Sequence, residues 1–103
     1  METNSRAMFL VVYKPSDAWI AGLPVSQQSL REHGRFLLEL YRQGSLKFAG
    51  PFSDDTGGAA VIVADDVIAA NALILEDPAV VNKVFVYEIH PWTLVSWDSD
   101  LKT

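Results

Sequence analysis

The stretch from Ser26 to Gln43 constrains the fold more than any other part of the sequence, because its apolar side chains recur with the period of an α-helix. The larger apolar side chains fall on one arc: Leu30, Phe36, Leu37, Leu38, Leu40 and Tyr41. Charged side chains fill the opposite arc: Arg31, Glu32, Arg35, Glu39 and Arg42. We expect Ser26 to cap the N-terminus of this helix and Gly44 to supply the left-handed residue after its end. Such an amphipathic helix is expected to pack on a sheet.

Short apolar runs that are rich in β-branched and aromatic residues are predicted to form the strands of that sheet. The runs are Met8–Tyr13, Leu46–Phe52, Ala59–Ala64 and Val84–Ile89. A turn rich in Asp and Gly would join the second and third strands into a hairpin. A second helix is expected from Asp65 or Asp66 to about Glu76, where Asp77-Pro78 would end it and open one further helical turn.

The resulting order, βαββαβ, is typical of the ferredoxin-like α+β fold. In that fold an antiparallel sheet carries both helices on one face and leaves its other face bare. The predicted strand Val84–Ile89 is not plainly polar on either face, and a bare, partly apolar sheet face is normally covered by a partner. We therefore expect a homodimer, to which the apolar tail from Trp92 to Trp97 also contributes.

Length and composition limit the class of protein further. With 103 residues the chain is expected to form one domain over residues 1–103, with the polar residues 1–7 frayed. Its net charge of −5 makes it a poor partner for nucleic acids and anionic membranes. The chain has no cysteine and only two histidines, so neither a metal site nor a disulfide is expected. No apolar run approaches the roughly 20 residues of a membrane span, and the start lacks the apolar stretch of a signal peptide, which predicts a cytoplasmic protein.

His33 and Asp77 are the first candidates for chemistry. His33 lies within the apolar arc of the first helix, where it can be a structural residue bonded to a loop carbonyl or a general base, because imidazole titrates near neutrality. Asp77 can cap the helical turn that Pro78 opens, or it can orient and support an imidazolium. Both roles of Asp77 can coexist, since a carboxylate has two oxygens. Spacing alone does not show that the two residues meet.

Trp19 and the segment Gly50-Pro51-Phe52 are the candidates for substrate binding. Trp19 lies in the loop Lys14–Val25, where it can be a packed anchor or a ligand contact, and we expect it to limit access to the pocket. Gly50 permits close backbone approach and Pro51 removes a donor from the strand ladder. This segment is therefore either a plain strand end or the rim of a site for a small ligand.

Several short motifs, in this order and spacing, resemble the YCII-related (YciI-like) family over nearly the whole chain. They are Met-Phe-Leu-Val-Val at 8–12, His33 in the first helix, Gly-Pro-Phe at 50–52, Asp-Pro at 77–78 and Glu-Ile-His-Pro-Trp at 88–92. The resemblance implies a ferredoxin-like fold, dimers of the dimeric α/β-barrel type and an architecture similar to that of muconolactone isomerases. It also implies an active site formed by a His–Asp pair, which falls on His33 and Asp77. Because a related member removes chloride from a chlorinated hydroxyquinol, a dehydrochlorinase or other lyase is implied. The loop Lys14–Val25 looks longer than in the short members of the family. The substrate of the related member therefore cannot be assigned to this chain.

The leading hypothesis is a small enzyme without a cofactor that removes a proton from a small organic substrate, followed by elimination or isomerisation. His33 would be the base and Asp77 would orient it. The alternative is a non-catalytic module that binds or senses a small molecule in the same dimer pocket. A plainer alternative is a scaffold domain that uses only its bare sheet face. A His33 that is bonded to Asp77 and reachable by solvent favours the enzyme, whereas a sealed His33 favours the module.

Overall fold

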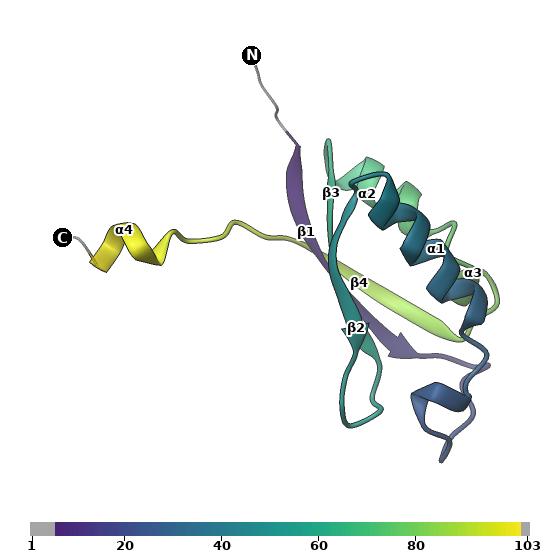
Figure 1. Ribbon diagram of the computed structural model, residues 1–103. Coiled ribbons are helices and arrows are strands. Elements are labelled where there is room, and N and C mark those ends of the chain that lie inside the picture. The colour runs from purple at the N-terminus through teal and green to yellow at the C-terminus, as the bar shows by residue number, and fades with distance from the viewer. Residues whose placement is uncertain (1–5, 102–103) are drawn as a thin grey trace.

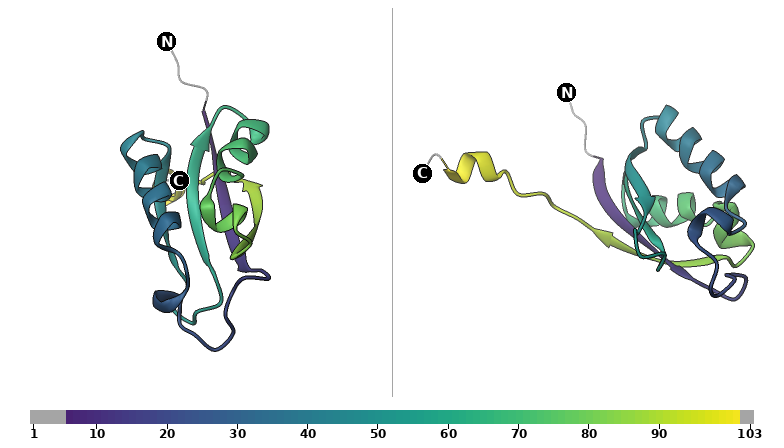
Figure 2. Two further views of the ribbon diagram at one scale, coloured as in Figure 1. Left: turned by 90° about the vertical axis from the view of Figure 1, so that its right-hand side faces the viewer. Right: turned by 60° about the horizontal axis from the view of Figure 1, so that its bottom comes forward.

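The computed structural model describes residues 6–101 (Figure 1). Its strands form one antiparallel sheet with the order β2-β3-β1-β4. They are β1 (Ala7–Pro15), β2 (Leu46–Pro51), β3 (Gly58–Ala64) and β4 (Phe85–Pro91). The helices α1 (Arg31–Arg42), α2 (Val67–Ile74) and α3 (Pro78–Val81) cover one face of this sheet, as Figures 1 and 2 show. The predicted ferredoxin-like α+β fold is confirmed.

The core lies between the sheet and the helices. The central strand β1 is hydrogen-bonded to β3 on one side and to β4 on the other. Because side chains alternate along a strand, Phe9, Val11 and Tyr13 all lie on the helix-covered face, and all are buried. Side chains from the other elements complete this core, among them Leu40, Leu46, Ile62, Ala70, Ile74 and Phe85. Burial of this apolar surface is the main force that holds the helices on the sheet.

The first helix begins later than the sequence predicted. Ser26 does not cap it, because Ser26 lies in a short 3₁₀ helix, η1 (Val25–Gln27). The α-helix α1 starts at Arg31, after Leu30, which makes no side-chain capping bond. The expected end of the helix is confirmed, since Gly44 has a φ of +82°, in the left-handed region that favours glycine.

Gln28 explains the late start of α1. Its backbone is extended, with φ −79° and ψ 162°, and its side chain is buried. The side-chain amide donates to the carbonyls of Ile20 and Leu23 at 2.8 and 2.9 Å, and its oxygen accepts from the backbone N–H of Ile20 at 2.9 Å. These bonds hold the preceding loop against the start of α1. Helical periodicity could not predict this role.

The two later helices begin at aspartates, as expected. Asp66 Oδ1 accepts from the backbone N–H of Ala69 at 2.8 Å at the start of α2, and Asp77 Oδ1 accepts from that of Ala79 at 2.9 Å at the start of α3. Pro78 follows as the first residue of α3, where its missing N–H has no helical partner to lose. Since α3 packs against α1, this turn brings Asp77 next to α1.

Both ends of the described chain contain secondary structure that the sequence did not predict. Residues 1–7 were expected to be frayed, but Ala7 begins β1 and Arg6 donates to the carbonyl of Val63 at 3.0 Å; residues 1–5 lie outside the described residues. At the other end, residues 92–96 extend away from the sheet and lead to α4 (Trp97–Leu101), a short helix that was not predicted (Figures 1 and 2). Among the helices of residues 6–101, none is long and apolar enough to span a membrane.

The sheet face away from the helices, which we call the open face, is largely apolar. By strand register its side chains include those of Met8, Leu10, Val12, Phe48, Val61, Val63 and Val86. Phe48 and Val86 are 72 % and 52 % exposed. Near one edge, a hydrogen bond from Lys14 and another from His90 hold the pKa of Glu88 below its usual value. A sheet face of this composition, without a helix on it, is a candidate interaction surface.

Candidate active site

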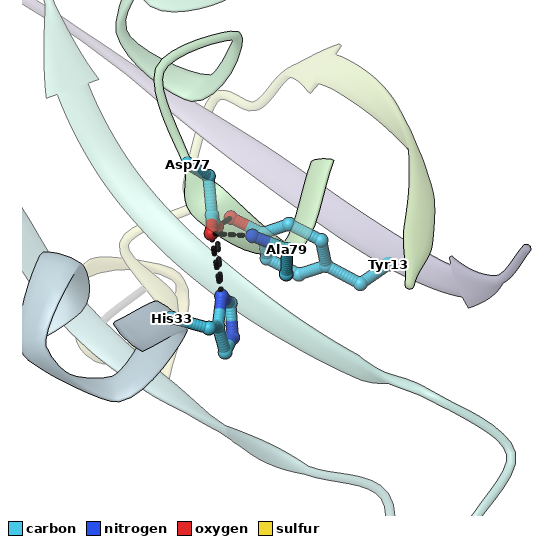
Figure 3. Close-up of polar contacts among 4 residues, drawn as sticks. All are labelled: Tyr13, His33, Asp77 and Ala79. Carbon is cyan, nitrogen blue, oxygen red and sulfur yellow. Dashed lines mark hydrogen bonds and ion pairs between the residues drawn. The ribbon is translucent and has the colours of Figure 1, made fainter. Parts of the chain in front are cut away.

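His33 and Asp77 lie in direct contact. His33 projects from the first turns of α1, and Asp77 stands at the start of α3. The Nδ1 atom of His33 is 2.7 Å from Oδ2 and 3.0 Å from Oδ1 of Asp77, as Figure 3 shows. The two candidates that the sequence analysis paired are therefore within hydrogen-bonding distance, without a bridging water.

Asp77 is fully buried, and its carboxylate accepts hydrogen bonds from three donors. Besides His33, the donors are the backbone N–H of Ala79 at 2.9 Å and the hydroxyl of Tyr13 at 3.0 Å (Figure 3). A buried carboxylate without partners would be very costly, so these donors are what allow Asp77 to stay in the interior. The capping role and the histidine-orienting role coexist in one side chain.

The contact with Asp77 determines which nitrogen of His33 is available. Because a carboxylate only accepts hydrogen bonds, Nδ1 carries the proton and donates a hydrogen bond to Asp77. In the neutral ring, Nε2 then has a free lone pair. Within residues 6–101, Nε2 has no hydrogen-bond partner. The His33 side chain is 13 % exposed, and His33 lines a pocket, so it is neither sealed in the core nor open on the surface.

Tyr13 is a third member of this cluster, and the sequence analysis missed it. Burial, with the negative charge of Asp77 beside it, raises the pKa of the phenol far above its ordinary value. Tyr13 therefore stays protonated and donates to Asp77. Its ring also meets that of His33 edge-on, with centroids 5.1 Å apart. One signal was available: a tyrosine at the end of a buried strand needs a partner for its hydroxyl.

The pocket has a volume of about 670 Å³ and lies between α1 and the hairpin of β2 and β3. Leucines of α1 form much of one wall, and backbone of the two strands forms the other. Two of the four predicted substrate-binding residues, Gly50 and Pro51, are in this lining. A volume of this size accommodates a small organic molecule.

The other two predicted substrate-binding residues lie elsewhere. Phe52 borders a shallow depression beside Ser53 and Asp54, outside the pocket lining. Trp19 is half-buried and packs on Phe85, with ring centroids 5.6 Å apart. Phe85 in turn lines the pocket and lies 5.5 Å from the ring of His33. Trp19 thus supports a pocket wall from behind.

The described residues contain no group of three or more His, Cys, Asp or Glu side chains that could hold a metal ion. The His33–Asp77–Tyr13 cluster supplies hydrogen-bonded polar groups at this site. Together, the fold and the site define a small ferredoxin-like α+β domain with a hydrogen-bonded His–Asp pair beside an apolar pocket.

The family follows from the sequence. Residues 6–93 match the model of the YCII-related domain, and the chain belongs to this family. An uncharacterized protein of Bacillus subtilis (strain 168), YjpA, is 39 % identical over 69 residues, which cover 67 % of this chain and 81 % of that protein.

A solved structure shares the fold. It is 5-chloro-2-hydroxyhydroquinone dehydrochlorinase (TftG) from Burkholderia phenoliruptrix AC1100, in complex with 2,5-dihydroxybenzoquinone. The TM-score is 0.62 at 19 % identity, and the match covers 87 % of this chain and 97 % of that one. At this identity the likeness shows the fold alone.

Proposed function

We propose that this protein is an enzyme that removes a proton from a small organic substrate with its own side chains, His33 being the general base. The single observation behind the proposal is the hydrogen bond between His33 Nδ1 and Asp77, which leaves Nε2 without a partner among the described residues at the wall of a pocket. This is the arrangement that a general base needs: one nitrogen oriented by a carboxylate and the other available to substrate.

The proposed chemistry has two forms. His33 Nε2 takes a proton from a carbon next to a carbonyl, and the C–H electron pair is delocalised into an enolate. In an elimination this pair forms a C=C bond while chloride leaves with the electrons of the C–Cl bond. In an isomerisation the imidazolium returns the proton to a different carbon. Asp77 stabilises the imidazolium in both, and the dehydrochlorinase activity of the structural neighbour is consistent with the first form.

Under this proposal Gly50 and Pro51 contact the substrate through the strand-end backbone. Trp19 acts indirectly, by holding Phe85 in the pocket wall. Phe52 is assigned to the outer rim beyond the lining residues. These roles rest on proximity to the pocket, and substitution of each residue tests them separately.

The test needs a reaction that does not presuppose the natural substrate. In D₂O, deuterium exchange into a panel of enolisable small ketones and lactones is followed by NMR, together with chloride release from 5-chloro-2-hydroxyhydroquinone. We expect His33→Ala to lower any rate by about 10²–10⁴-fold, and Asp77→Asn to lower it less. Circular dichroism checks that both variants are folded. A His33→Ala variant as fast as the wild type would refute the proposal.

A second function, a small-molecule-binding or regulatory module, is favoured by one observation. The His33 side chain is only 13 % exposed, which limits the access of a substrate to Nε2. Under this reading the His–Asp–Tyr cluster is structural and the pocket binds a ligand without changing it. Ligand binding without exchange or chloride release for every probe would favour the module.

We also propose that the protein is a homodimer. The supporting observations are the apolar open face, with Phe48 and Val86 exposed, and the exposed apolar side chains of the arm at residues 92–101. That arm extends away from the body in Figure 1 and in the right-hand view of Figure 2. Two open faces packed together would form the dimeric α/β barrel that the sequence analysis expected.

A further inference from the structure

The pocket differs in charge from the rest of the molecule. The whole chain has thirteen acidic and eight basic residues. Nevertheless, no Asp or Glu is among the described residues that line the pocket, and Lys47 is the one Lys or Arg there. Asp77 stands behind His33 rather than in the lining, and its charge is met by the donors of His33, Tyr13 and Ala79. The pocket of an acidic protein is thus apolar with one cationic group.

Strand geometry explains why Lys47 is at the pocket. Leu46 and Ala49 both pair with residues on the buried face of β3, and the ladder is irregular between Leu46 and Phe48. Such a bulge inserts one extra residue and changes the direction of a side chain. Regular alternation would put Lys47 opposite to Leu46. The bulge interrupts that alternation, and both residues line the pocket.

The ammonium group of Lys47 has no ion-pair partner within residues 6–101. Several other cations of the described chain do have one: Lys14 pairs with Glu88, Arg35 with Glu32 and Arg42 with Glu39. Lys47 is exposed, and the apolar pocket lining beside it lowers the local dielectric constant, which strengthens the attraction between its ammonium group and an anion in the pocket.

We infer that the pocket takes substrates with an apolar body and one anionic oxygen group, such as a carboxylate or an ionised phenol, and that Lys47 binds this group. The inference deepens the proposed function, since it rests on the same site.

The experiment measures binding and does not require turnover. Benzoate and its neutral counterpart benzamide, with cinnamate and cinnamamide as a second pair, are titrated into the full-length protein and followed by NMR. We expect the acids to bind more tightly than the amides. Lys47→Gln should weaken binding of the acids about tenfold and leave the amides unchanged. Added salt should weaken acid binding in the wild type and much less in Lys47→Gln.

The matched control is Lys83→Gln, which makes the same change of net charge at an exposed position outside the pocket. The inference is overturned if both variants weaken acid binding equally, if the amides bind as well as the acids, or if none of the acids binds at millimolar concentration. A His33→Ala variant with full turnover would refute the proposed base instead, and it would leave the binding result for Lys47 standing.

Discussion

At the scale of single residues, Asp77 links three parts of the chain. One carboxylate caps α3, orients His33 of α1 and accepts from Tyr13 of β1. A carboxylate in that position supports the fold and the site by the same hydrogen bonds. Stability and function are therefore coupled at this residue, and variants must be chosen to separate them.

Asp77→Ala removes the acceptor from three donors that have little access to water. We expect a loss of about 3 kcal/mol of unfolding free energy, measured by urea denaturation, because buried donors are left unpaired. Asp66→Ala is the matched control: it removes a helix cap with one backbone donor at an exposed position and should cost about 1 kcal/mol. Equal losses for the two variants would mean that the contacts with His33 and Tyr13 contribute nothing.

The raised pKa of Tyr13 leads us to expect that the free energy of unfolding depends on pH in the alkaline range. Its pKa is raised in the folded protein, so the unfolded chain releases this proton more readily. The stabilisation is complete below the ordinary pKa of about 10 and is lost as the pH rises above it. Urea denaturation between pH 8 and 11 should show a smaller loss of stability for Tyr13→Phe than for the wild type. The exposed Tyr41→Phe serves as the control and should follow the wild-type curve.

At the scale of elements, the loop before α1 depends on Gln28. Gln28→Ala removes three bonds to the loop backbone, and we expect a loss of about 2 kcal/mol together with faster hydrogen exchange at the Ile20 amide. Gln43→Ala, at an exposed position after α1, is the control and should change neither measurement. Unchanged exchange at Ile20 in Gln28→Ala would show that other contacts hold the loop.

Periodicity was sufficient to predict the order of the four strands and of α1 and α2, because each of these elements has its own local pattern of apolar residues, whereas η1 and α4 were not predicted. The features that the sequence analysis missed depend on side-chain contacts that no periodic pattern records. Gln28 bonds to carbonyls of the preceding loop, eight and five positions earlier, and Tyr13 contacts Asp77 across 64 positions. His33 and Asp77 were paired through the resemblance to a family, since no local pattern connects residues 44 positions apart.

At the scale of the whole molecule, the helices bury one face of the sheet and leave the other with exposed apolar side chains. The arm at residues 92–101 adds further exposed apolar groups, among them Trp97, which is 69 % exposed. Within the described residues, the last backbone hydrogen bond from this arm to the sheet runs from Trp92 N–H to the carbonyl of Met8. A second copy of the chain would cover the apolar side chains of the open face and of the arm. We therefore predict that association depends on the open face.

Val86→Arg tests that dependence, because Val86 lies on the open face and is half exposed in the single chain. If two open faces pack together, the substitution buries an unpaired charge, which costs several kcal/mol, so the dimer should dissociate at micromolar concentration. Sedimentation velocity would then show a species of 11.4 kDa, whereas the wild type should sediment as twice that mass.

The matched control is Ile68→Arg, which introduces the same side chain at an exposed position of α2 on the helix side and should leave the dimer intact. A wild type that sediments only as a monomer would refute the homodimer, and dissociation by Ile68→Arg but not by Val86→Arg would move the interface to the helices.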